Sequence, residues 1–241
     1  TATKRSSSCA CKATVKRVMG IAFSGLLPLF FALWCCTAVA QDRLSADVTV
    51  RQAYKGKSVR VEKQVFYSSN GNLVVHFTKP QEYFMITNRL GETSVYQPKA
   101  NEVMQMNDQS MSSETELLAV FMSPSYADLG LTRLGFVLSK VEKEGTDQVK
   151  TYTPTHIDDK AIKKVVVVCR DGNPIYCAFY NQSDQVIKKT FYSRYVVLPA
   201  MTFPTMITQI AYDTKGDSVI KREEYSNIRT KDFPSDALFD Y

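Results

Sequence analysis

The sequence predicts a mainly β protein whose strands pair antiparallel in a sandwich or a barrel. Two observations lead to this fold class. Short runs that alternate apolar and polar residues fill the chain after residue 40, and turn residues such as Asn70-Gly71 separate them. One segment in that part, residues 112–122, instead shows apolar residues at helical spacing.

The first 40 of the 241 residues have the pattern of a secretory signal peptide. They hold five basic residues and no acidic one, and an uncharged run ends at the small-residue site Ala38-x-Ala40. Two alternatives are a membrane-spanning anchor, since about 20 apolar residues cross a bilayer, and a lipoprotein signal at Cys35-Cys36. The absence of a basic flank after the run favours cleavage after Ala40. We therefore expect residues 41–241 to form one exported domain.

The basic character of the chain belongs to this leader. The whole chain has 30 Lys and Arg against 24 Asp and Glu, a net charge of +6. Without residues 1–40 the balance is 25 basic against 24 acidic residues. Because nucleic-acid binding needs concentrated positive charge, we do not expect a nucleic-acid partner.

Six strands are predicted in the first half of the domain. They span residues 41–55, 58–67, 73–77, 83–88, 93–96 and 102–106. Asn70-Gly71 favours a hairpin turn, because both central residues of a type I′ turn need positive φ. Pro80 ends the third of these strands, since proline donates no ladder hydrogen bond.

A helix is predicted over residues 112–122. Ser113 and Glu116 have the spacing of a capping box, in which each side chain bonds the other residue's backbone N–H. Leu117, Leu118, Phe121 and Met122 fall on one helical face, and Pro124 follows. This face is expected either to plug an ordinary core or to act as a lid over a concave apolar surface, and periodicity does not separate the two.

Strands resume after the helix. They are predicted over residues 133–142, 148–153, 162–169, 175–180, 185–197, 204–213 and 217–225. Cys169 and Cys177 flank the turn between two of them, and we predict a disulfide between them, with two buried free thiols as the alternative. A three-residue turn at Gly172–Pro174 would pair the cysteines, whereas a two-residue turn at Gly172-Asn173 would offset them.

The search for catalytic motifs is negative. The sequence has no G-x-S-x-G, no Walker loop and no G-x-G-x-x-G. Its two histidines, His76 and His156, stand apart, and the parity of His76 places it on the outer face of a strand. We therefore expect no enzyme, no metal and no cofactor, because zinc sites need three or four spaced ligands.

The order of the elements resembles that of the outer-membrane lipoprotein carrier family (LolA-like), with Bacteroidetes-type members nearest. The matching steps are Thr78-Lys79-Pro80, Arg89-Leu90-Gly91-Glu92, Tyr96-Gln97-Pro98, Ser226-Asn227 and Phe239-Asp240-Tyr241. A helix and a "V…RDG" hairpin lie between them in the order that the family has.

The resemblance implies an incomplete, half-open β-barrel formed by one curved antiparallel sheet and closed by a short helical lid. It also implies a monomeric periplasmic carrier, which takes acylated lipoproteins from an inner-membrane export complex to an outer-membrane acceptor without bond chemistry. The alternative is a lipid- or lipoprotein-sensing module of the envelope on the same fold, without transport activity.

Ten residues are the predicted lipid-binding cavity. The sheet is expected to supply Val65, Tyr67, Val75, Phe77, Phe84 and Ile86, and the lid Leu117, Leu118, Phe121 and Met122. Proteobacterial members carry an Arg-Pro pair, linked to lid closure, where this chain has Ser69-Asn70. Many members also have a helix before the first strand, where this chain runs directly into strand.

Overall fold

The computed structural model describes residues 43–108, 112–123, 126–156, 162–199, 201–213 and 216–230. The chain divides into two units, Thr1–Val39 and Ala40–Tyr241, and all described residues belong to the second. The predicted signal peptide, Pro124 and the family-like ending at 239–241 lie outside the described residues. Within the described ranges, no helix is both long and apolar enough to cross a membrane.

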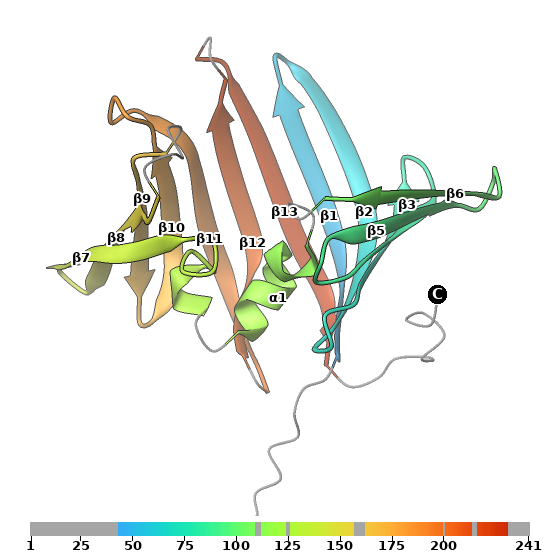
Figure 1. Cartoon of the computed structure of the whole chain (residues 1–241), viewed down its shortest axis with the longest axis horizontal. Coiled ribbons are helices and arrows are strands. Elements are labelled where there is room, and N and C mark those ends of the chain that lie inside the picture. Colours follow the sequence, from blue (N-terminus) through green and yellow to red (C-terminus); the bar gives the residue numbers. More distant parts are fainter. Residues whose placement is uncertain are drawn as a thin grey trace, which may run out of the picture. The chain divides into compact units, whose positions relative to one another are not determined.

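The described residues form thirteen strands and one short α-helix (Figure 1). The strands are β1 (Arg43–Tyr54), β2 (Lys57–Ser68), β3 (Leu73–Lys79), β4 (Tyr83–Thr87), β5 (Glu92–Gln97), β6 (Glu102–Asn107), β7 (Phe136–Glu144), β8 (Asp147–Pro154), β9 (Lys164–Arg170), β10 (Asn173–Tyr180), β11 (Val186–Leu198), β12 (Met201–Tyr212) and β13 (Ser218–Arg229). Each strand predicted from the sequence overlaps one of these, with the ends moved by a few residues.

All thirteen strands belong to one antiparallel sheet, in the order β6-β5-β4-β3-β2-β1-β13-β12-β11-β10-β9-β8-β7. The first and last strands pair in the middle of the sheet, where Val48 lies opposite Tyr225. β6 and β7, which are consecutive in the chain, are the two outer edges. The sheet is strongly curved but not closed (Figure 1), so the predicted half-open barrel is confirmed and the sandwich is not.

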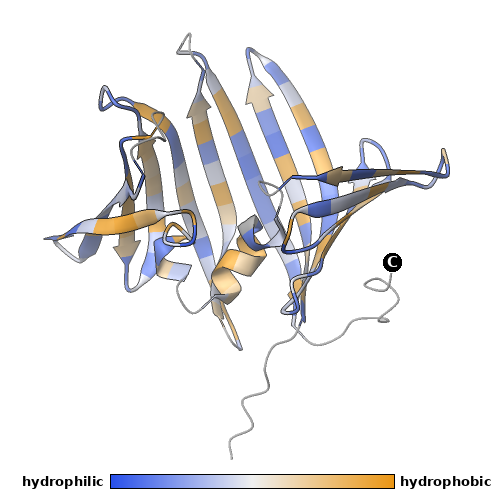
Figure 2. Cartoon of the chain, viewed as in Figure 1, coloured by the Kyte–Doolittle hydropathy of each residue, from blue (hydrophilic) through white to orange (hydrophobic). Residues whose placement is uncertain are grey.

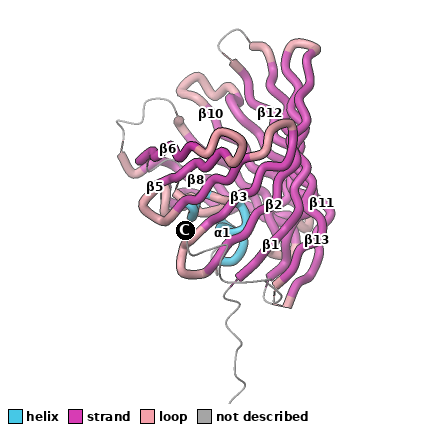
Figure 3. The backbone as a smooth tube through the Cα atoms, turned by 90° about the vertical axis from the view of Figure 1, so that its right-hand side faces the viewer, coloured by secondary structure: helices cyan, strands magenta, loops and turns pink. Residues whose placement is uncertain are grey.

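The segment between β6 and β7, residues 108–135, joins the two edges and must therefore cross one face of the sheet. We call it the crossing segment. Its described parts contain a 3₁₀ turn at Ser113–Thr115 (η2), helix α1 at Leu117–Met122 and a second 3₁₀ turn at Tyr126–Asp128 (η3). Seen from the side, α1 lies on the inner side of the curve (Figure 3).

The predicted capping box is wrong. α1 begins at Leu117 with Glu116 as its N-cap, and no side chain caps it. The Ser113 hydroxyl instead donates to the backbone carbonyl of Gly71 at 2.6 Å. The 3₁₀ turn η2 is capped by Ser112, whose hydroxyl accepts from the Glu114 N–H at 3.3 Å. The serine predicted to begin the helix thus fastens it to the β2–β3 turn.

Two apolar clusters lie between the crossing segment and the sheet. The larger joins α1 to β1, β2, β3, β12 and β13. The smaller joins Leu131 and Phe136 to Tyr152 on β8, two valines of β9 and the cysteines Cys169 and Cys177. The crossing segment thus supplies apolar side chains to both halves of the concave face.

Replacing Phe121 with alanine tests whether this packing stabilises the fold. Phe121 is 1% exposed, so we expect Phe121→Ala to lower the free energy of unfolding by about 3–5 kcal/mol. Val197, 85% exposed at the β11–β12 hairpin, is the control, and Val197→Ala should change it by less than about 0.5 kcal/mol. Urea unfolding followed by circular dichroism measures both, and a loss below about 1 kcal/mol for Phe121→Ala would contradict the packing.

Candidate functional site

The strand register defines a continuous apolar surface on the concave side of the sheet. Residues directly opposite each other in an antiparallel pair point to the same face. The pairs Leu44–Tyr67, Val65–Val75 and Val48–Tyr225 therefore continue one face across four strands. We call the buried sheet side chains of this face the concave cluster: Leu44, Ala46, Val48, Val50, Val65, Tyr67, Leu73, Val75, Met201, Phe203, Ile207 and Tyr225.

Helix α1 fills the middle of this face. Its residues Leu118, Ala119, Val120 and Phe121 are buried, and Figure 2 shows the apolar helix lying across apolar strand segments. The Phe121 ring lies 5.4 Å from the Phe203 ring and makes further ring contacts with Tyr126, Tyr192 and Tyr195 at 5.5 to 6.4 Å between centroids. Phe121 is thus the centre of an aromatic group that joins the helix to β11 and β12.

Eight of the ten predicted cavity residues meet on this face. Val65, Tyr67, Val75, Leu118 and Phe121 are buried in the concave cluster or against it, and Phe77, Leu117 and Met122 pack at its margin, half-buried. Whether they contact lipid stays a prediction.

The assumption that Phe84 and Ile86 share this face is wrong. Val75 lies opposite Met85 and Phe77 opposite Tyr83, so it is Tyr83, Met85 and Thr87 of β4 that continue the concave face. Phe84 stacks on His76 on the other face, with ring centroids 4.1 Å apart. This stack confirms that His76 lies on the outer face, where its Nε2 is 3.1 Å from an oxygen of Glu82.

Sequence reasoning also missed the far half of the surface. Phe203 and Ile207 lie on β12, and Tyr225 lies on β13. β13 pairs with β1, which is far from it in the chain, and β12 pairs with β13. Alternation within each strand identifies which residues share a face, but it does not identify which strand lies next to which. The pairing of the first and last strands was the missing information.

Two small cavities border the crossing segment. One, of about 240 Å³, lies between it and β10–β13, and the other, of about 220 Å³, lies beside Glu114 and Arg133. Val120, Leu129 and Leu134 line both. The crossing segment is therefore bordered by open pockets on two sides.

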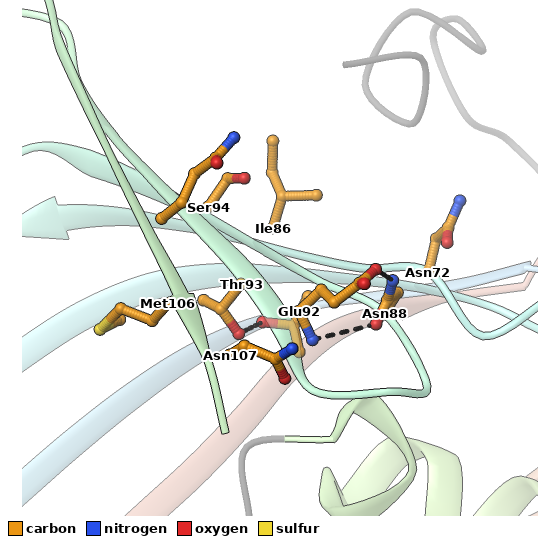
Figure 4. Close-up of a pocket in the computed structure, with 10 residues that line it drawn as sticks. Asn72, Ile86, Asn88, Glu92, Thr93, Ser94, Met106 and Asn107 are labelled. Carbon is orange, nitrogen blue, oxygen red and sulfur yellow. Dashed lines mark hydrogen bonds between the residues drawn. The ribbon is translucent and has the colours of Figure 1, made fainter. Parts of the chain in front are cut away.

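A third hollow, of about 550 Å³, lies over β4–β6 beside Asn72 and is mostly polar (Figure 4). Its side chains bond one another: Asn88 Nδ2 donates to Glu92 at 2.6 Å, and the Thr87 and Thr93 hydroxyls are 3.0 Å apart. Because these groups are already paired, we do not assign a ligand to this hollow.

The N-terminal end of the crossing segment is anchored to two turns of the sheet. Glu114 lies between Arg133, at 3.2 Å, and Arg89, at 3.4 Å, and Ser112 donates to the Arg89 carbonyl at 2.8 Å. Arg89 also donates to the Ser69 carbonyl. The sequence has no arginine in the turn at Ser69-Asn70, where proteobacterial family members carry one. Arg89 nevertheless reaches this turn, because the β4–β5 turn lies beside the β2–β3 turn.

The predicted disulfide is not formed. Cys169 and Cys177 are both buried free thiols, and the register places Cys177 opposite Val167, and Cys169 opposite Pro174. The two-residue turn at 171–172 and the register shift between Pro174 and Tyr176 together produce this offset. Burial raises the pKa of both thiols, that of Cys177 to about 12, so both stay protonated at neutral pH.

The tyrosines of the face are neutral. Burial raises the pKa of Tyr192 and of Tyr225 well above the ordinary value of a phenol. The Tyr225 hydroxyl donates to Glu223 at 3.2 Å, and Glu223 pairs with Lys221 at 2.5 Å. Among the described residues, no three His, Cys, Asp or Glu side chains lie close enough to hold a metal ion.

The two thiols provide a test of the register. A thiol reacts as its thiolate, so we expect Cys169 and Cys177 to resist iodoacetamide at pH 8 in the folded protein and to react fully after denaturation without reductant. Peptide mass mapping separates them from the cysteines of residues 1–40, and an introduced Val197→Cys serves as the fast control. Recovery of the two peptides joined by a disulfide would show that the register is wrong.

Neither a family model nor a curated protein matches the sequence. Solved structures do match the fold. A LolA superfamily protein from Nitrosomonas europaea is 17% identical over 83% of this chain and 90% of its own, with a TM-score of 0.55. A DUF1329 family protein from Desulfovibrio piger is 17% identical over 82% and 89%, with a TM-score of 0.56.

A third match is a putative outer membrane lipoprotein-sorting protein domain from Vibrio parahaemolyticus, 12% identical over 83% of this chain and 90% of its own, with a TM-score of 0.57. At these identities the matches show the fold alone. That this chain is nearest to Bacteroidetes-type members stays a prediction. The open sheet, its concave apolar face and the matches together show that this chain has a LolA-like fold.

Proposed function

We propose that this chain is a periplasmic carrier that binds the acyl chains of lipoproteins and ferries them from the inner to the outer membrane. One observation carries the proposal: the apolar side chains of α1 fill the hollow of an open sheet. An acyl chain needs the same apolar surroundings that Leu118 and Phe121 now occupy. Cargo and helix therefore compete for one place.

Helix α1 is well suited to leave that place. It has six residues and no side-chain cap, and isolated helices of this length do not persist in water. Its position depends on packing and on the anchor at Ser113 and Glu114, and cavities border the crossing segment on two sides. Displacing it leaves every strand of the sheet paired.

The exchange is close to balanced in free energy. Exposing a large apolar side chain costs roughly 1.5–3 kcal/mol, and burying a methylene of the cargo returns about 0.8 kcal/mol. Exposing Leu117, Leu118, Phe121 and Met122 together would therefore cost about 6–12 kcal/mol, which the burial of about 8–15 methylenes, roughly one acyl chain, would return. A near balance of this kind permits both uptake and release, which a carrier needs.

The proposed transfer makes and breaks no covalent bond, so it calls for no catalytic group and no cofactor. The donor would be an inner-membrane export complex and the acceptor an outer-membrane protein, with this chain acting as a monomer between them. The similarity to the putative outer membrane lipoprotein-sorting protein domain from Vibrio parahaemolyticus supports this assignment.

A soluble complex with lipoprotein tests the proposal. The exported protein, mixed with a triacylated lipoprotein in detergent that is then diluted, should hold the lipoprotein in solution and elute with it in gel filtration. Leu118→Asp places a charge in the apolar hollow and should abolish this complex, whereas Val197→Asp at the exposed hairpin should not. Circular dichroism checks that each variant folds.

Two outcomes would decide against the proposal or narrow it. If wild-type protein leaves the lipoprotein insoluble, the carrier function is wrong. If a complex forms but the lipoprotein is never passed to outer-membrane acceptors, the chain is a binding or sensing module. The non-acylated form of the same lipoprotein is the control, and its binding would show that the acyl chains are not what is recognised.

The Glu114 anchor predicts a second effect. Glu114→Gln weakens both ion pairs of the anchor, and exposed pairs contribute about 0.2–1 kcal/mol each. The crossing segment should then open more often, and lipoprotein uptake should quicken by about two- to fivefold. Glu142→Gln removes an exposed pair with Lys140 on β7 and is the matched control. Equal uptake rates in the two variants would show that the anchor does not limit opening.

A further inference from the structure

The 240 Å³ cavity has two unlike walls. The crossing segment supplies one wall with the apolar side chains Leu117, Val120, Leu129, Leu131 and Leu134. The sheet supplies the other, which is partly polar: Lys188, Thr190, Gln209, Lys221 and Glu223, with Cys177, Phe179, Tyr192 and Ile207 between them. A cavity that is apolar on one side and polar on the other suits an amphiphile.

The charges in this cavity do not cancel. Lys221 and Glu223 pair with each other at 2.5 Å. Lys188 has no carboxylate partner among the residues that the structure describes, and its ammonium lies 4.1 Å from the centroid of the Phe179 ring. Cys177 and Tyr192 are protonated, for the reason given above. One positive charge, on Lys188, is therefore left over.

Lys188 is also partly removed from water. It is half-buried, and burial lowers its pKa. A cation over an aromatic ring gains some stabilisation. A desolvated ammonium gains more from an anion that accepts a hydrogen bond from it. Its neighbour on the strand, Lys189, points to the opposite face, where its ammonium lies near the Tyr212 ring. The two adjacent lysines thus form a matched pair, one inside the cavity and one outside.

We propose that this cavity binds the anionic head group of a lipid, a carboxylate or a phosphate, on Lys188, with the lipid chain directed along the apolar wall of the crossing segment. The proposal rests on the proposed function only in that the concave face accepts an acyl chain. It adds a second class of ligand, because the acylated end of a lipoprotein carries ester and amide groups and no anion.

The size of the cavity limits what it holds before the crossing segment moves. Ligand sites for drug-sized molecules span about 300–1,000 Å³, so 240 Å³ accommodates a head group with the first part of a chain. The remainder of the chain would follow α1's path once that helix is displaced. Leu134, 61% exposed, marks where the cavity reaches solvent.

Pairs of ligands that differ only in charge test the proposal. Palmitate is compared with methyl palmitate, and 1-palmitoyl-glycerol 3-phosphate with 1-palmitoyl-glycerol, by displacement of a fluorescent fatty acid from the exported protein at pH 7. We expect at least one charged ligand to bind about tenfold more tightly than its neutral counterpart. The stronger of the two charged ligands identifies the carboxylate or the phosphate as the group recognised.

Variants at the two lysines assign the effect to the cavity. Lys188→Met should remove the preference for the charged ligand and leave the neutral ligand's affinity within about twofold, Lys188→Arg should keep the preference, and Lys189→Met should not change it. Equal affinity of wild-type protein for charged and neutral ligands, or a preference that survives Lys188→Met, would overturn the proposal.

The same variants separate this proposal from the carrier function. Lys188→Met should still form the soluble complex with acylated lipoprotein, because that cargo is neutral at its lipid end. If wild-type protein holds lipoprotein but shows no charge preference, the anion site alone is wrong. If it shows the charge preference but holds no lipoprotein, the carrier function is wrong and the cavity serves an anionic lipid instead.

Discussion

One topological constraint determines the rest of this structure: β6 and β7 are consecutive in the chain but lie at opposite edges of the sheet. The segment between them has to cross a face, and an open curved sheet offers an apolar one. The crossing segment therefore buries Leu118, Phe121 and Leu131 where a closed barrel would have buried side chains of its own strands. The hollow is therefore filled by a segment whose described parts form no strand of the sheet.

In this arrangement the pairing of the strands does not depend on which apolar groups fill the hollow. The strands are held by their ladders, including the central pairing of β1 with β13, whether or not α1 is in place. The helix is held by side-chain packing and by a few bonds at one end, from Ser113 to Gly71 and from Glu114 to two arginines. In a protein built this way, the acyl chain of a ligand can take the place of the helix's apolar side chains. In our proposal, Lys188 in the adjoining cavity adds a preference for a ligand with a negative charge.

Much of the fold could be predicted from the sequence, because alternation and turn residues are local signals. The strands, the helical segment and the outward face of His76 follow from them. The face of Phe84 and Ile86 could not, since it depends on how the turn around Pro80 sets the register of β4 against β3, which alternation within each strand does not reveal. The cysteines are offset because the turn falls at residues 171–172 and the register shifts again between Pro174 and Tyr176. Arg89 was missed because its neighbour Ser69 is 20 residues away in the chain and adjacent only in space.

The central claim is that cargo replaces α1 on the concave face. Hydrogen–deuterium exchange of residues 41–241, with and without an acylated lipoprotein, tests this most directly. The account predicts faster exchange of the amides in residues 117–122 when the lipoprotein is bound, with strands β1–β3 and β12–β13 still protected. Unchanged or slower exchange in 117–122 while the lipoprotein is held in solution would show that α1 stays in place and that the cargo binds elsewhere.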